Sequence, residues 1–146
     1  MKKSVGAIII YKNKFLLQKR DKKNDIYFSD LWGVFGGSLK NKESPKMAVE
    51  REIMEEINVK LKFKKFLEND ILSKNFNPRR RRYFFYSNIK YREIKKIVLN
   101  EGKSFDFFNL KQLEKLSIVP WDYAAIKYFY FSKIKKMQVI PQKKSK

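Results

Sequence analysis

Residues 44–58 constrain the fold of this chain most, because they carry both ends of one helix and an unusual charge pattern. Ser44 is a favourable N-cap, Pro45 suits the first helical position, and Asn58 suits a left-handed residue after the last turn. Five of the fifteen acidic residues fall between positions 43 and 56, although the formal charge of the chain is +20. We therefore predict a helix over 45–57 and a compensating positive charge beside its acidic face.

The acidic and apolar side chains of this helix separate into two faces. At 100° per residue, three carboxylates fall within about 100° of one another, namely those of Glu52, Glu55 and Glu56. The apolar stripe follows an i, i+4, i+8 spacing, namely Val49, Ile53 and Ile57. Glu50 falls beside this stripe, so we expect it at the solvent edge of the helix. The stripe must pack on a core, and the carboxylates must face something else.

The absence of cysteine and histidine restricts the chemistry open to those carboxylates. Without either residue the chain has no disulfides, no thiolate metal site and no His or Cys nucleophile. Any metal is therefore held by oxygen, which favours a hard cation, Mg²⁺ first and Mn²⁺ as the alternative. Three carboxylates three and four residues apart are suitable ligands for such an ion. A solvated acidic face paired with lysines is the alternative interpretation of the same spacing.

A longer motif surrounds the acidic helix. Gly37, five residues, Glu43, seven residues and then the stretch from Arg51 to Val59 resemble the Nudix box, G-x5-E-x7-R-E-U-x-E-E-x-G-U, in which U is a bulky aliphatic residue. The one departure is Asn58 in place of the last glycine, a replacement that a left-handed backbone tolerates best. A weaker resemblance extends from about Lys3 to Phe131.

The resemblance implies a fold and a set of roles. The expected fold class is α/β, a Nudix-type α/β/α sandwich with a mixed sheet and a catalytic loop-helix-loop. Glu52, Glu55 and Glu56 are implied as ligands of catalytic Mg²⁺, with Glu56 the most sensitive to loss. Gly36 and Gly37 are implied to offer backbone groups to metal or phosphate. Arg51 and Glu43 are implied to brace the loop on the helix, and Glu101 is implied as a further ligand or general base. A merely solvated Glu101 is the alternative.

Period and turn signals predict the remaining elements. We expect strands over 5–10, 15–18, 32–35, 59–63, 83–89 and 104–108 and further helices over 110–116 and 121–134. Lys12-Asn13 separates the first two strands as a hairpin turn, and residues 20–31 are expected to form a loop. We expect one domain over 1–134 and a basic, flexible tail over 135–146.

The strong positive charge suggests an anionic partner, such as nucleotide or RNA, although lysine outnumbers arginine 28 to 7 and a general compositional bias explains this equally well. No apolar run is long enough to span a bilayer, so we expect a cytoplasmic protein with no membrane partner. A homodimer is compatible with the sequence, but no segment marks an interface.

Two segments outside the box are candidates for substrate binding. Arg79 begins a run of four arginines that leads into a strand, so alternate members, Arg79 and Arg81, can point together toward phosphate. An exposed basic turn is the alternative. Tyr27 can stack on a base or sugar, or can pack in the core. Trp121 and Asp122 are open to both interpretations.

The function implied by the resemblance is metal-dependent pyrophosphohydrolysis by water attack at phosphorus. The substrate is a nucleoside diphosphate linked to another moiety, as in a nucleoside triphosphate, nucleotide sugar or dinucleotide. The alternatives are removal of pyrophosphate from the 5′ end of RNA and a non-catalytic nucleotide-binding module. Attack at the sugar carbon of a nucleotide sugar is disfavoured because the box is retained.

Overall fold

Strand β1 (Lys2–Tyr11) runs through the middle of the molecule and is buried from Val5 to Ile10. The computed structural model describes residues 2–22, 30–71 and 80–134. Six consecutive buried positions mean that both faces of β1 are covered, as expected for a strand between two helical layers. The predicted hairpin with β2 (Lys14–Lys19) is confirmed, and Lys12 and Asn13 form its turn with φ angles of 48° and 60°.

The described strands form one mixed sheet, in the order β3-β2-β1-β6-β5, with β4 also paired to β1 and β7 to β2. Strands β1 and β6 are parallel, and the other pairs are antiparallel. The further strands are β3 (Trp32–Gly33), β4 (Phe35–Ser38), β5 (Lys64–Ile71), β6 (Arg80–Asn88) and β7 (Ser104–Phe108). The expected mixed sheet is thus confirmed.

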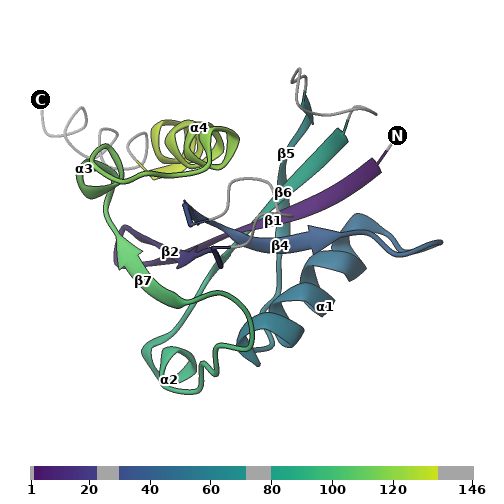
Figure 1. Ribbon diagram of the computed structural model, residues 1–146, viewed down its shortest axis with the longest axis horizontal. Coiled ribbons are helices and arrows are strands. Elements are labelled where there is room, and N and C mark those ends of the chain that lie inside the picture. Colours follow the sequence, from purple (N-terminus) through teal and green to yellow (C-terminus); the bar gives the residue numbers. More distant parts are fainter. Residues whose placement is uncertain (1, 23–29, 72–79, 135–146) are drawn as a thin grey trace, which may run out of the picture.

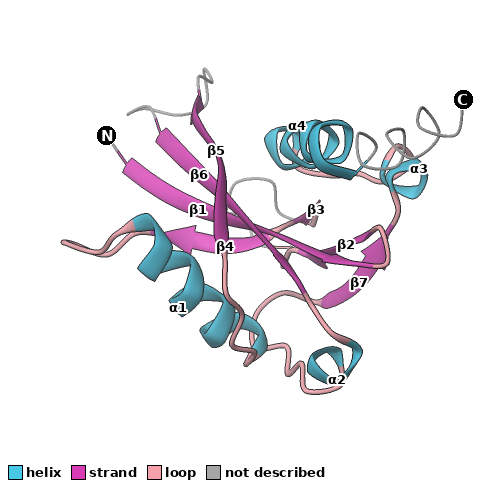
Figure 2. Ribbon diagram, turned by 180° about the vertical axis from the view of Figure 1, so that it is seen from behind, coloured by secondary structure: helices cyan, strands magenta, loops and turns pink. Residues whose placement is uncertain are grey.

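Helices cover both faces of this sheet (Figures 1 and 2). One face carries α1 (Pro45–Ile57) and α2 (Tyr91–Ile94), and the other carries α3 (Leu110–Leu113) and α4 (Pro120–Phe129). The alternation of strand side chains divides the core between these layers, so that Ile9 and Phe85 pack toward α1 whereas Ile8 and Phe84 pack toward α4. The α/β/α sandwich is therefore confirmed. None of the described helices is both long and apolar enough to cross a membrane.

Helix α1 has the predicted limits. The Ser44 side chain accepts a hydrogen bond from the Met47 N–H at 3.2 Å, and Asn58 adopts the left-handed conformation at φ 59°. The Asn58 N–H donates to the Met54 carbonyl at 3.0 Å, which closes the last turn. The apolar stripe is buried and Glu50 is exposed, as expected.

The strand predicted over 59–63 is wrong. Val59, Leu61 and Phe63 are buried and the intervening lysines are exposed, but this segment pairs with no described strand, and β5 begins only at Lys64. The alternation therefore reflects packing on the core beneath α1 and not a hydrogen-bonded ladder.

Other boundaries also differ from the predictions, and β6 begins at Arg80 although a strand over 83–89 was predicted. The strand expected over 32–35 divides at Val34, whose N–H donates to the Asp122 carboxylate at 3.1 Å. The helix expected over 110–116 ends at Leu113, and the one expected over 121–134 changes at Tyr130 to a π-helical turn, Tyr130–Ile134. Helix α2 was not predicted, because its four residues are too short to show a period.

Candidate active site

Glu56 lies in the last turn of α1 and carries a buried carboxyl group, since only 2% of the residue is exposed. One oxygen accepts a hydrogen bond from the Gly36 N–H at 2.9 Å, and the other accepts from the Gln18 side chain at 3.3 Å. Burial, and then the negative charges of Glu101 and Glu52, raise the pKa of Glu56 to about 9. A cation that replaces the proton of such a buried carboxyl group stabilises its charged form.

Close packing of α1 on β4 places this carboxylate beside the two glycines. A Cβ at Gly36 would collide with the carbonyl oxygen of Val5 on the paired strand β1. A Cβ at Gly37 would lie 2.5 Å from the Glu52 carboxylate. Both positions therefore need glycine for close approach, one to a backbone and the other to an acidic side chain.

A network around Arg51 connects the loop after β4 to α1. The guanidinium binds both oxygens of Glu43, at 2.7 and 2.9 Å, and donates to the Ser38 carbonyl at 3.1 Å. The same group lies 3.0 Å from Glu52 and 3.2 Å from Glu55. Hydrogen bonds from Arg51 and from the Lys40 N–H lower the pKa of Glu43 to about 2.

The loop between α2 and β7 covers the carboxyl end of α1 and brings Glu101 to the site. The Asn100 N–H donates to the Glu56 carbonyl at 2.8 Å, its side chain donates to the Glu55 carbonyl at 3.0 Å, and the Val98 N–H donates to the Ile57 carbonyl. These bonds satisfy carbonyls that a helix end leaves without partners. Glu101, the next residue, lies close enough to raise the pKa of Glu56 and is itself exposed.

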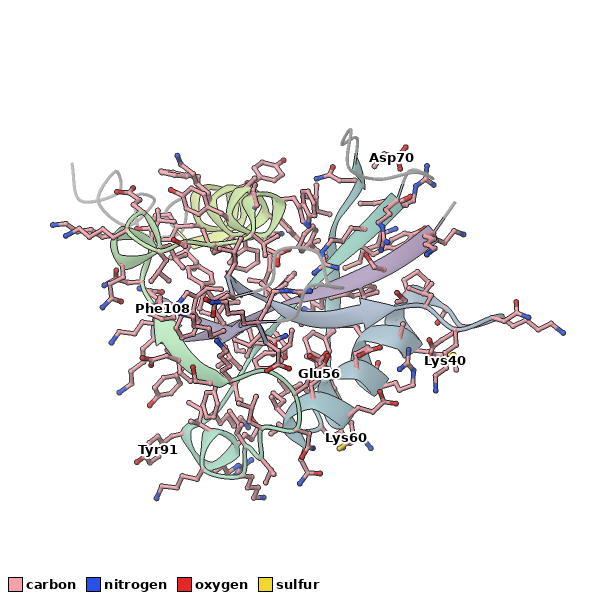
Figure 3. All side chains as sticks on the ribbon, in the orientation of Figure 1. Lys40, Glu56, Lys60, Asp70, Tyr91 and Phe108 are labelled. Carbon is pink, nitrogen blue, oxygen red and sulfur yellow. The ribbon has the colours of Figure 1, made fainter. Side chains whose placement is uncertain are left out.

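A small pocket of about 100 Å³ joins these groups. Its lining residues come from β2, the loop after it, β4, α1 and the loop before β7, namely Gln18, Arg20, Asp21, Gly36, Glu56, Glu101 and Gly102. Figure 3 shows Glu56 between α1 and the loop that leads into β7. The pocket therefore combines two of the predicted acids, one predicted glycine and an arginine.

The donor chemistry of this region suits a divalent cation. All candidate ligands are oxygens, and burial together with the charges of Glu101 and Glu52 raises the pKa of Glu56. Within the described residues, no three acidic side chains already converge on one ion-sized point. Glu55 is 53% exposed and shares the Arg51 guanidinium with Glu52, so both side chains must turn to share a metal ion instead.

Two arginines of the run at 79–82, Arg81 and Arg82, lie on opposite faces of the sheet. Arg81 pairs with Asp70 at 2.8 Å and Glu68 at 3.2 Å on β5, and Figure 3 shows Asp70 well away from Glu56. Arg82 lies on the opposite face, 3.3 Å from the buried Asp122 of α4. Neither arginine lines the acidic pocket, and Arg79 and Tyr27 lie outside the described residues.

The sequence did not indicate Arg20, Asp21 and Gly102 as residues of the pocket wall, nor two residues that bind the acidic helix. Gln18 was treated only as part of a strand, and Asn100 was not singled out at all. They lie 38 and 45 residues from the groups that they bind, Glu56 and the Glu55 carbonyl, so no local pattern connects them. A buried glutamine among apolar strand residues was the one available signal.

These features define a class of α/β/α proteins in which a glycine-bearing strand and an acidic helix enclose a carboxylate pocket. The chain belongs to the NUDIX family, because the family model, described as NUDIX domain, matches residues 1–129. It is a Nudix hydrolase, an enzyme that acts on phosphoric anhydride bonds.

Solved structures support the fold. The MutT NUDIX hydrolase from Burkholderia pseudomallei is 21% identical, with a TM-score of 0.74 over 86% of this chain and 95% of that one. The MutT protein from Methanosarcina mazei Go1 is 20% identical, with a TM-score of 0.76 over 91% and 95%. The E. coli dihydroneopterin triphosphate pyrophosphohydrolase is 20% identical, with a TM-score of 0.68 over 87% and 93%. No curated protein matches the chain.

Proposed function

We propose that this Nudix hydrolase is a divalent-metal-dependent pyrophosphohydrolase that cleaves a nucleoside diphosphate derivative by attack of water at phosphorus. The observation that supports it most is Glu56, a buried carboxyl group whose pKa is raised to about 9 by burial and by two neighbouring acids. A group of this kind is costly in a purely structural role, because the charged form is desolvated and repelled. A catalytic cation offsets that cost.

In this proposal Glu52, Glu55 and Glu56 hold Mg²⁺, or Mn²⁺ in its place. When bound, the metal supplies positive charge to the phosphate oxygens and lowers the pKa of the attacking water. The protein orients the principal ligand, since Gly36 and Gln18 bind its two oxygens. To hold the ion, Glu52 and Glu55 would have to turn away from Arg51, which would remain bound to Glu43.

The remaining pocket residues suit phosphate and proton handling. Glu101 lies at the exposed rim beside Glu56, where a carboxylate that is not committed to metal accepts the proton of the attacking water. Arg20 is part of the pocket wall, and a guanidinium there suits a phosphate oxygen. We keep Arg79, Arg81 and Tyr27 as proposed substrate contacts, although Arg81 must first leave Asp70.

The proposed substrate class is nucleotide-type, namely a nucleoside triphosphate, nucleotide sugar or dinucleotide. The formal charge of +20 favours one further candidate, an RNA with a 5′-triphosphate. Strong salt dependence of turnover distinguishes RNA from small substrates, because each phosphate contact releases counterions.

The test is phosphate release from a panel of these substrates, coupled to a pyrophosphatase and a phosphatase, with Mg²⁺. We expect one class to be cleaved and Glu56→Gln to reduce its turnover by at least about 100-fold. Glutamine keeps the acceptor for the Gly36 N–H, so the variant should fold. Glu50→Gln, at an exposed glutamate of the same helix, is the matched control and should retain activity.

Two results contradict the proposal. The first is equal turnover of wild type and Glu56→Gln, which removes Glu56 from the chemistry. The second is nucleotide binding with no cleavage of any class in Mg²⁺ or Mn²⁺, which establishes the binding-module alternative.

A further inference from the structure

Tyr91 is a large aromatic residue that remains mostly exposed and is not part of the hydrophobic core. It is 59% exposed on the short helix α2, beside a pocket of about 270 Å³ that is separate from the acidic one. We call this pocket the aromatic cleft, and it is lined by Tyr11, Lys12, Lys14, Tyr91, Ile94 and Phe107. The turn of the first hairpin, α2 and β7 each contribute to it. None of its residues lines the acidic pocket.

Three rings form the walls of the aromatic cleft. The Tyr11 and Tyr91 ring centroids are 6.5 Å apart with the planes inclined at 31°, and Phe107 meets Tyr11 edge-on at 6.1 Å. Tyr11 and Phe107 are half-buried and pack against the core beneath α1, so their positions are held by the fold. Tyr91 faces solvent, so its ring is accessible to a flat partner. Exposed aromatic rings in a basic groove are the platforms on which bases of single strands stack.

Positive charge surrounds the rings. The Lys12 ammonium lies 5.4 Å from the Tyr11 ring centroid, and the Lys95 ammonium lies 4.8 Å from that of Tyr91. The exposed cations close in sequence to Tyr91 are Lys90, Arg92, Lys95 and Lys96. Between residues 86 and 100 the one acid is Glu93, which accepts a hydrogen bond from the Lys90 N–H, and residues 2–20 contain none. The occupant that fits is therefore anionic as well as flat.

We propose that the aromatic cleft binds a nucleotide of a single-stranded oligonucleotide, with a base against Tyr91 and backbone phosphates on the surrounding lysines. We choose a chain over a free nucleotide because it presents several phosphates, and the cations come from both the hairpin turn and α2. Phe107 follows Glu101 by six residues, which spans roughly 22 Å at most. A chain held here can thus extend its 5′ end toward the acidic pocket. That extension rests on the proposed function, whereas binding in the aromatic cleft does not.

The test measures binding alone, by fluorescence anisotropy of a short labelled oligouridylate with the Glu56→Gln protein in EDTA. Removal of the ring in Tyr91→Ala should weaken binding about 5- to 100-fold. Tyr91→Phe keeps the ring and should bind as the parent does. Tyr128→Ala is the matched control, because Tyr128 is 56% exposed on α4, on the opposite face of the sheet, and its loss should leave binding unchanged.

The lysines are tested through salt dependence. Combined Lys12→Ala and Lys14→Ala should reduce the slope of log affinity against log salt by about 1 to 1.5, since each phosphate contact on a single strand releases about 0.7 of a counterion. The inference is overturned if Tyr91→Ala and Tyr128→Ala bind equally, because charge alone then explains the affinity. It is also overturned if uridine monophosphate competes at the same concentration as the oligouridylate, because the cleft then binds a free nucleotide.

The two proposals fail independently. Oligouridylate binding that depends on Tyr91, together with no cleavage of any anhydride by the wild type, refutes only the proposed function. Cleavage of a small nucleotide with no effect of Tyr91→Ala on oligouridylate binding refutes only the aromatic cleft.

Discussion

Glu43 and Arg51 form the ion pair that joins the loop after β4 to α1. Both oxygens of Glu43 are bound by the guanidinium, and the same guanidinium contacts two of the proposed metal ligands, Glu52 and Glu55. Paired, fork-like hydrogen bonds are more directional than a single contact. At the scale of single residues, this pair therefore holds the Arg51 guanidinium beside Glu52 and Glu55.

Glu43→Gln should lower the free energy of unfolding by about 1 to 3 kcal/mol at pH 7, because Arg51 loses a charged acceptor. The folded-state pKa of Glu43 is about 2, below its ordinary value of 4.5, so the stabilisation is present above pH 4.5 and is lost as the pH falls toward 2. Urea unfolding at several pH values checks this. The difference between wild type and variant should shrink in that window, with Glu50→Gln as control, and a difference that is constant down to pH 2 contradicts the assignment.

At the scale of elements, β4 is the strand on which the site depends, since β1 lies on one side of it and α1 packs against it. The two glycines of β4 meet different obstacles. A Cβ at Gly36 meets the backbone of β1, which cannot move without the sheet, whereas one at Gly37 meets the end of the Glu52 side chain, which can rotate. The same mutation should therefore have two different effects.

Gly36→Ala should lower the melting temperature, with a cost of about 1 to 3 kcal/mol typical of overpacking. Gly37→Ala should leave the melting temperature nearly unchanged but lower turnover on the order of 100-fold, because displacement of Glu52 misplaces a proposed metal ligand. Melting curves and the phosphate-release assay on both variants check this. Equal losses of stability in the two variants would falsify the distinction.

At the scale of the whole molecule, charge is distributed unevenly, with a formal excess of +20 and a concentration of acids at α1. Self-repulsion of the excess opposes compactness, and salt screens it over about 10 Å at 0.1 M. Repulsion of Glu56 by Glu52 and Glu101 is local, and a proton or the proposed metal ion on Glu56 relieves it.

Sodium chloride should therefore raise the melting temperature of wild type and Glu56→Gln alike. Mg²⁺ at matched ionic strength should raise the free energy of unfolding of the wild type only, by about 2.7 kcal/mol when its concentration is 100 times the Kd, and so raise its melting temperature further. Thermal unfolding in the two salts checks this. If Mg²⁺ raises the melting temperature of Glu56→Gln by as much as that of the wild type, the ion binds elsewhere than at Glu56.

Local sequence signals were sufficient to predict α1 and the first hairpin. The cap at Ser44, the left-handed residue at Asn58 and the turn at Lys12-Asn13 are each specified within a few residues, so the sequence predicted them correctly. The Nudix box is equally local, and it led to the family and to the α/β/α fold. The prediction of a strand over 59–63 was wrong, because an alternation of apolar and polar residues indicates one buried face but does not show that the segment pairs with another strand.

The sequence by itself determined the helix, its acidic face and the family, because these depend on neighbours three to eight residues apart. Only the tertiary structure decided that Gln18 binds Glu56, that Asn100 closes the end of α1 and brings Glu101 beside it, and that Arg81 turns to Asp70. It also formed the aromatic cleft from Tyr11, Tyr91 and Phe107. The physical reason is that such contacts join segments distant in the chain, and their geometry exists only after the sheet has paired and both helical layers have packed.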